Sequence, residues 1–91
     1  MPYIPQNERT GLDNFIHSIA DEIKNTDDPQ KIEARFNYFL SKLIRMVYGE
    51  PRYTKINSVL GMLEAVKFEF YRMYGAPYEE EKRKEHGDIV I

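Results

Sequence analysis

The sequence contains no cysteine and no tryptophan, and only two of its 91 residues are histidine. Without cysteine, the chain has no disulfide bond, no cysteine-ligated zinc or iron–sulfur cluster and no catalytic thiol. No apolar run approaches the ~20 residues that a membrane-spanning helix needs. The opening Met1-Pro2-Tyr3-Ile4-Pro5 also lacks the basic-then-apolar order of a signal peptide. These absences predict a cytoplasmic protein that does not contact a membrane.

The composition is that of an ordinary globular protein, with 42% hydrophobic and 31% charged residues. Thirteen Lys and Arg against 15 Asp and Glu give a net charge of −2. This balance argues against bulk attraction to duplex nucleic acid or to membranes. A chain this short cannot divide its core, so we expect a single helical domain over residues 1–91.

Apolar residues recur at i, i+3, i+4 and i+7 in three long segments, which is the pattern of amphipathic helices. Asp28-Pro29 is typical of a helix start, whereas Gly49-Glu50-Pro51 and Gly75-Ala76-Pro77 predict stops. Three long helices with short links predict an all-α fold, a compact antiparallel three-helix bundle with a short fourth helix at the C-terminal end. The predicted helices cover about residues 11–25, 29–48, 54–74 and 77–85, with tails at 1–9 and 87–91. The pattern assigns no role to the Ile89-Val90-Ile91 tail.

Several stretches of the sequence together form a recognisable pattern. They are Met1-Pro2-Tyr3-Ile4, Phe36-Asn37-Tyr38, Ile56-Asn57-Ser58-Val59-Leu60-Gly61-Met62-Leu63-Glu64-Ala65-Val66-Lys67-Phe68-Glu69-Phe70-Tyr71-Arg72, Ala76-Pro77-Tyr78-Glu79-Glu80 and Glu85-His86-Gly87-Asp88. In these stretches the chain resembles, over nearly its whole length, a family of short uncharacterised proteins of bacteriophages and prokaryotes. His86, where that family has Asn, departs from the pattern. The resemblance implies a phage or mobile-element setting, and it transfers no activity and no site residue.

The residues that could perform catalysis are few. His17 and His86 lie at opposite ends of the chain, and no serine stands beside a credible base. His17 and Asp21 share a helix face, but two ligands do not make a metal site. Glu64 and Glu69, five residues apart, point to different faces. We therefore expect a protein that is not an enzyme and that needs no metal or cofactor.

The middle of the chain is positively charged. Residues 1–30 have a net charge of −4, residues 31–72 of +4 and residues 73–91 of −2. Within the second predicted helix, four cations and one tyrosine fall on one narrow side. Cations of this kind pair with phosphates, and a tyrosine ring stacks on a base. The residues predicted to bind an anionic or nucleotide-type ligand are Lys31, Arg35, Tyr38, Lys42 and Arg45, which we call the basic stripe. The alternative is a solvated face whose long side chains cover apolar surface.

The third predicted helix has a second surface opposite its apolar stripe. Gly61 costs up to ~1 kcal/mol relative to alanine inside a helix, and Gly61 with Ala65 lets another backbone approach closely. The first helix, the short C-terminal helix or a second subunit could cover this surface. The residues predicted to form an interface are Gly61, Glu64, Ala65, Phe68 and Tyr71.

The leading hypothesis is a small non-enzymatic binding protein that self-associates and holds an anionic ligand on the basic stripe. Its sharpest form is a phage protein that sequesters a host nucleotide signal and so counters a host defence. The alternative is a protein–protein adaptor or inhibitor that acts through the third helix and the acidic C-terminal helix. Duplex DNA binding ranks third, because a short basic stripe on a net-negative chain predicts binding that salt abolishes.

Overall fold

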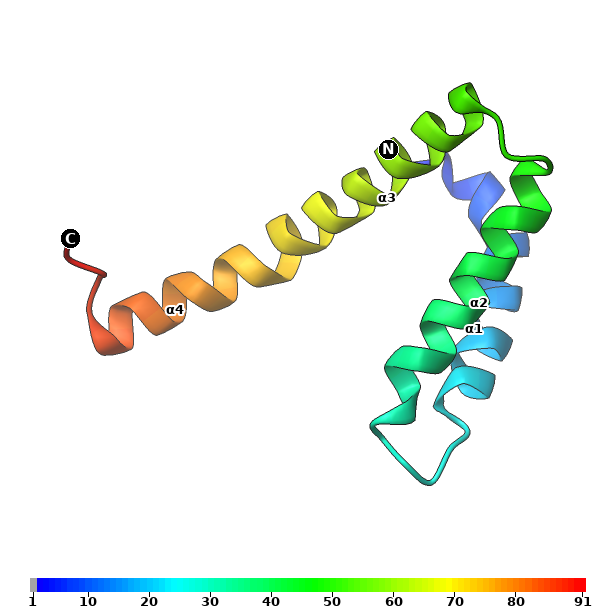
Figure 1. Cartoon of the computed structure of the whole chain (residues 1–91). Helices are drawn as coiled ribbons and strands as arrows, with labels where there is room; N and C mark the ends of the chain where they lie inside the picture. Colours follow the sequence, from blue (N-terminus) through cyan, green and yellow to red (C-terminus); the bar gives the residue numbers. More distant parts are fainter. Residues whose placement is uncertain (1) are drawn as a thin grey trace. The chain divides into compact units, whose positions relative to one another are not determined.

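A computed structural model describes residues 2–91, and all of its regular elements are helical (Figure 1). The elements, in chain order, are η1 (Gln6–Glu8), α1 (Arg9–Lys24), α2 (Lys31–Tyr48), α3 (Tyr53–Phe70), η2 (Tyr71–Gly75) and α4 (Ala76–His86). No strand occurs in this part of the chain. The predicted all-α class is confirmed. No helix of the described residues combines the length and apolar composition needed to cross a bilayer.

The described chain divides into two compact units, residues 2–56 and residues 57–91, with the division inside α3. The first unit holds η1, α1, α2 and the first turn of α3. The second holds the rest of α3 with η2 and α4. The single domain and the bundle arrangement that the sequence suggests therefore remain predictions.

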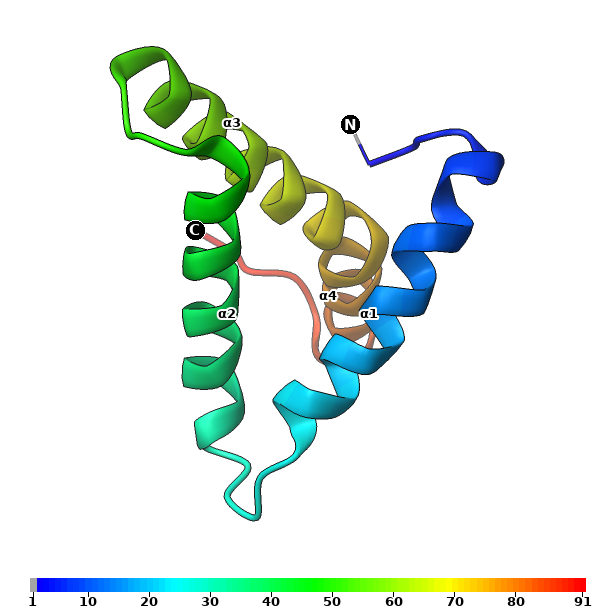
Figure 2. The same cartoon turned by 90° about the vertical axis from the view of Figure 1, so that its right-hand side faces the viewer.

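The first unit is built around a hairpin of α1 and α2. The two helices lie close at the connecting loop and diverge away from it (Figure 2). Ile23, in the last turn of α1, is 8% exposed and is the one buried side chain among residues 2–91. Hydrogen bonds from Arg35 of α2 to the carbonyls of Glu22 and Ile23 also join the two helices near the loop.

The loop between α1 and α2 follows the predicted break. The Asp28 carboxylate accepts a hydrogen bond from the Gln30 N–H at 3.0 Å, and the Asp28 N–H donates to the Thr26 hydroxyl at 3.2 Å. Regular α-helix begins at Lys31, two residues later than predicted. The reason is that the N–H groups of Lys31 and Ile32 bond carbonyls three residues back, so this turn is wound more tightly than an α-helix.

The N-terminal segment is more ordered than the predicted tail at 1–9. Pro5 precedes the 3₁₀-helix η1, and the Glu8 N–H bonds the Pro5 carbonyl at 3.0 Å. The Arg9 Nε donates to the Ile4 carbonyl at 2.8 Å. These short-range bonds bring the start of α1 forward to Arg9. Met1 of the predicted tail lies outside the described residues.

The predicted stop at Gly75-Ala76-Pro77 is wrong, because α3 continues through η2 into α4. η2 is a π-helical turn in which the Ala76 N–H bonds the Tyr71 carbonyl, five residues back. Proline has no N–H, and in a regular α-helix its ring clashes with the carbonyl four residues earlier. The wider π turn relieves this conflict at Pro77, which lies in the first turn of α4. As a result, α4 extends α3 and does not fold back over it.

Gly49, which ends α2, has a backbone conformation that other residues rarely adopt, with φ +75° and ψ −142°. We expect Gly49→Ala to lower the free energy of unfolding by about 1–3 kcal/mol, because an L side chain is strained there. Gly11→Ala is the matched control, since a Cβ at Gly11 in α1 meets no described atom within 4 Å. The control should raise stability by up to ~1 kcal/mol. Urea denaturation followed by far-UV circular dichroism measures the free energy of unfolding of both variants. Equal changes in the two variants would show that the backbone conformation of Gly49 is not the cause.

Candidate functional site

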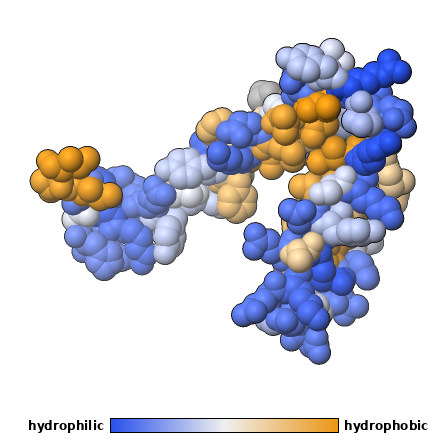
Figure 3. All heavy atoms as spheres, in the orientation of Figure 1, coloured by the Kyte–Doolittle hydropathy of each residue, from blue (hydrophilic) through white to orange (hydrophobic). Residues whose placement is uncertain are grey.

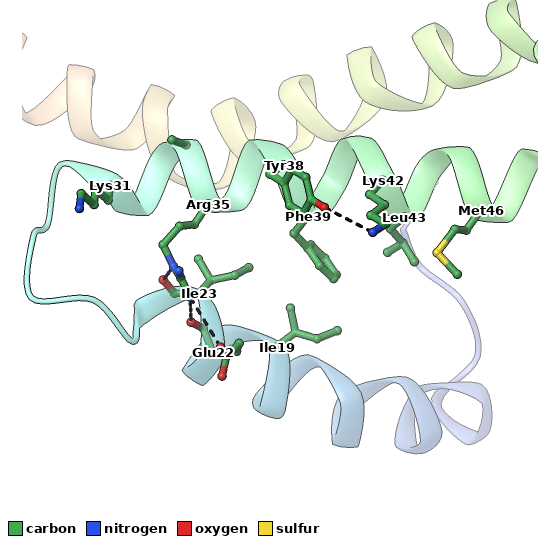
Figure 4. A pocket seen from close by; sticks show the side chains of 11 residues that line it. Ile19, Glu22, Ile23, Lys31, Arg35, Tyr38, Phe39, Lys42, Leu43 and Met46 are labelled. Carbon is green, nitrogen blue, oxygen red and sulfur yellow. Dashed lines mark hydrogen bonds and ion pairs between the residues drawn. The ribbon is translucent and has the colours of Figure 1, made fainter.

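A groove lies between α1 and α2 within the first unit. Its volume is about 710 Å³, inside the range of ~300–1,000 Å³ that small-molecule sites occupy. Figure 4 shows Ile19 and Ile23 of α1 pointing toward α2, and Phe39 and Leu43 of α2 pointing toward α1. The side chains that line the groove are Ile19, Glu22, Ile23, Lys31, Ala34, Arg35, Tyr38, Phe39, Lys42, Leu43 and Met46. The groove therefore has a largely apolar wall with polar groups contributed mainly by α2.

Four of the five residues of the basic stripe line this groove, namely Lys31, Arg35, Tyr38 and Lys42. Arg45 does not line it. The Arg45 guanidinium donates to the Gly49 carbonyl and lies 3.3 Å from the Glu50 carboxylate. It therefore binds groups that directly follow the C-terminal end of α2. A cation at this end of a helix also complements the helix dipole.

Arg35 binds the end of α1. Its Nε donates to the Ile23 carbonyl at 3.0 Å, and one Nη donates to the Glu22 carbonyl at 2.6 Å. The same Nη lies 3.7 Å from the Glu22 carboxylate. Carbonyls in the last turn of a helix lack α-helical partners. Arg35 supplies a partner to the Ile23 carbonyl and adds a second donor at the Glu22 carbonyl, which also accepts the Asn25 N–H at 3.2 Å. Its guanidinium is thus occupied within the protein.

The remaining cations of the groove are available to a ligand. The Lys42 Nζ donates to the Tyr38 hydroxyl at 3.3 Å and lies 5.7 Å from the centre of its ring. The Lys31 ammonium makes no hydrogen bond or ion pair with any described residue. Tyr38 is 66% exposed, so its hydroxyl hydrogen can still be donated. The basic stripe therefore divides into two groups. Arg35 and Arg45 bind backbone carbonyls of the protein, whereas Tyr38, Lys42 and the more distant Lys31 are left for a ligand.

The five residues of the predicted interface, which we call the α3 interface surface, are exposed within the second unit. A Cβ added at Gly61 would meet no described atom within 4 Å, and Phe68 is 60% exposed. Glu64 and Lys67 form an ion pair of 3.3 Å, and the Lys67 ammonium lies 5.6 Å from the centre of the Phe68 ring. These contacts are local, within one helical turn.

Tyr71, which the sequence assigns to the interface surface, contacts α4 through its hydroxyl group. Its hydroxyl donates to the Glu79 carboxylate at 2.9 Å. This hydrogen bond, with the nearby negative charge, raises the pKa of Tyr71 above its ordinary value. A Cβ at Gly75 would lie 2.6 Å from the Tyr71 ring, so glycine makes room for the ring. The spacing of four residues between Tyr71 and Gly75 was the signal that sequence reasoning missed.

No group of three or more His, Asp or Glu side chains in residues 2–91 could hold a metal ion. Hydrophobic atoms, drawn in orange in Figure 3, gather on part of α3 and at the C-terminal end. At that end Ile89, Val90 and Ile91 are each at least 86% exposed.

The fold and the groove define a small all-helical protein whose α-helical hairpin carries an apolar groove with lysine and tyrosine at its edge. Residues 1–89 match the family described as Domain of unknown function (DUF6899), and the chain belongs to this family. No curated protein and no solved structure matches the chain.

Proposed function

We propose that this protein is a non-enzymatic binding protein that holds an anionic organic ligand in the groove between α1 and α2. The observation that supports it best is that most of the basic stripe lines an apolar groove of ligand size. Small-molecule sites typically combine apolar walls with a few polar groups that orient the ligand. A ligand here would place its body against Phe39 and Leu43 and its negative charge near the lysines.

The nucleotide-type ligand suggested by the sequence is one form of this proposal. A base would stack on Tyr38 while phosphates meet Lys31 and Lys42. In the phage setting that the sequence resemblance implies, such a protein would remove a host signal from solution. Sequestration requires tight binding and no turnover, which suits a protein without an evident catalytic group.

Charge reversal in the groove tests the proposal. We expect Lys31→Glu combined with Lys42→Glu to weaken binding of anilinonaphthalene sulfonate, an aromatic anion, by about tenfold, since charge reversal replaces an attractive ion contact of up to ~1 kcal/mol with a repulsion of similar size. Fluorescence titration measures the dissociation constant.

Lys24→Glu combined with Lys84→Glu is the matched control, because these lysines lie outside the groove and pair locally with Asp21 and Glu81. The control makes the same change in net charge. Equal affinities of the two double variants would exclude the groove as the binding site.

We also propose the bundle arrangement and self-association that the sequence suggests. Two apolar side chains of α2 that do not line the groove, Phe36 and Val47, are 51% and 70% exposed. Packing of α3 on these side chains would cover them and leave the groove open. The α3 interface surface would then face outward. α4 extends α3 and therefore cannot cover this surface. We propose that a second copy of the chain covers it.

An adaptor or inhibitor is the second candidate function. The exposure of Phe68 and the open position at Gly61 favour it, since such a surface also suits a different protein. α4 contributes less than its acidic residues suggest. Its charges pair with one another, as in the Arg83–Glu80 ion pair, which lowers the pKa of Glu80 below its ordinary value. Affinity capture from host lysate separates the two functions, because an adaptor retains one protein in stoichiometric amount and a ligand-binding protein retains none.

A further inference from the structure

We infer that the groove between α1 and α2 takes an anionic amphiphile, a molecule with an aliphatic chain that ends in one carboxylate or phosphate group, held by Tyr38 and Lys42. This inference rests on the proposed function and narrows the ligand class. It favours an amphiphile over the nucleotide that the sequence suggests.

The cations of the groove that are free to bind a ligand are too few and too far apart to bind a polyphosphate together. Arg35 is bound to the carbonyls of α1, and Glu22 lies beside it. Lys31 and Lys42 are eleven residues apart on one helix, which corresponds to ~16 Å along its axis. Two lysines at that separation cannot both contact one compact anionic group. A single anionic head at one end of the groove fits this arrangement.

The groove also lacks the groups that would read a nucleobase. None of its lining residues is Asn, Gln, Ser or Thr, and its wall consists mainly of aliphatic side chains with Phe39. A base buried there would leave its donors and acceptors without partners, which costs free energy. An aliphatic chain has no such groups and gains from being removed from water.

Tyr38 and Lys42 form the better of the two anion positions. The Lys42 Nζ donates to the Tyr38 oxygen at 3.3 Å and retains two further N–H groups. The Tyr38 hydroxyl can donate its own hydrogen to the same anion. Leu43 and Met46 lie beside this pair, so a chain attached to the head would run directly onto apolar surface. Lys31 offers only a single ammonium, which makes no hydrogen bond or ion pair with another polar group of the groove.

Calorimetric titration of the full chain with dodecyl phosphate, dodecanoate, dodecanol, AMP and ATP, each below its aggregation concentration, tests the inference. We expect the two amphiphilic anions to bind at least about tenfold more tightly than AMP, ATP or dodecanol. Lys42→Gln should weaken the binding of dodecyl phosphate by about tenfold, whereas Lys31→Gln should change this affinity by less than about threefold. Ala34→Trp, which fills the groove without changing charge, should abolish binding, with the fold checked by circular dichroism.

The outcomes separate the two levels of the proposal. Tighter binding of AMP or ATP than of the amphiphiles would overturn this inference and leave the proposed function intact. Absence of binding by every anion would overturn both. Amphiphile binding that is unchanged by Ala34→Trp would also overturn the inference, because the molecule would then bind elsewhere on the protein.

Discussion

The proposed self-association through α3 predicts that a Phe68→Glu variant is monomeric at concentrations at which the unmodified protein forms the proposed dimer, with the dissociation constant raised by at least about 100-fold. Phe68 is 60% exposed, and burying such a ring at an interface stabilises by ~1.5–3 kcal/mol. In a two-fold symmetric dimer the same change occurs in both copies, so its effect counts twice. The introduced carboxylates would in addition lose water without gaining a partner.

The spacing on α3 explains why Phe68 should carry so much of this interface. Gly61 and Phe68 are seven residues apart, about two turns, and therefore lie on one side of the helix. In an antiparallel pair of α3 helices, Phe68 of one copy would face the open position at Gly61 of the other. The two-fold axis would repeat the contact.

Analytical ultracentrifugation over a range of concentrations measures this effect. Tyr78→Glu is the matched control, because it makes the same kind of change at a 64% exposed aromatic residue of α4. The control should keep the dimer. A monomeric unmodified protein at high concentration, or equal effects of the two substitutions, would exclude the α3 interface surface as the site of self-association.

The helices could be predicted from the sequence because their signals are local. The loop at Asp28 forms through hydrogen bonds between residues two apart, which turn chemistry makes readable. The continuation through Gly75 and Pro77 could not be predicted from the same rules. It depends on a π turn and on the Tyr71 ring beside Gly75, whereas glycine and proline in sequence indicate a stop.

The candidate site was predicted in part. Helical spacing predicts one side of the helix for the basic stripe, because positions three and four apart share a face, and four of its residues line one groove. The spacing does not show what each cation contacts. Arg35 meets Glu22 and Ile23, which are 13 and 12 residues away in the chain, and that proximity arises only when α1 and α2 pair. A binding role and a structural role therefore have the same signature in sequence.

Arg35→Gln is expected to lower the free energy of unfolding by about 2–3 kcal/mol, because it removes two charged hydrogen bonds that hold the end of α1. The Arg35 side chain is 38% exposed, so water replaces part of what is lost, and the estimate is below the sum for two buried bonds. Chemical denaturation measures the change. Hydrogen exchange should also show faster exchange of amides in the last turn of α1.

Lys42→Gln is the reciprocal variant, since it removes a cation from the same groove while its one polar contact is to Tyr38. We expect its stability to change by less than about 0.5 kcal/mol, as for most exposed substitutions. In titrations with dodecyl phosphate, Lys42→Gln is expected to be the more affected variant. It should bind about tenfold more weakly than the unmodified protein, whereas Arg35→Gln should keep its affinity within about threefold. If Arg35→Gln instead lost affinity at unchanged stability, Arg35 would be a ligand-binding residue, as the helical spacing alone suggests. The two variants together therefore separate the cation that holds the hairpin from the cation that meets the ligand.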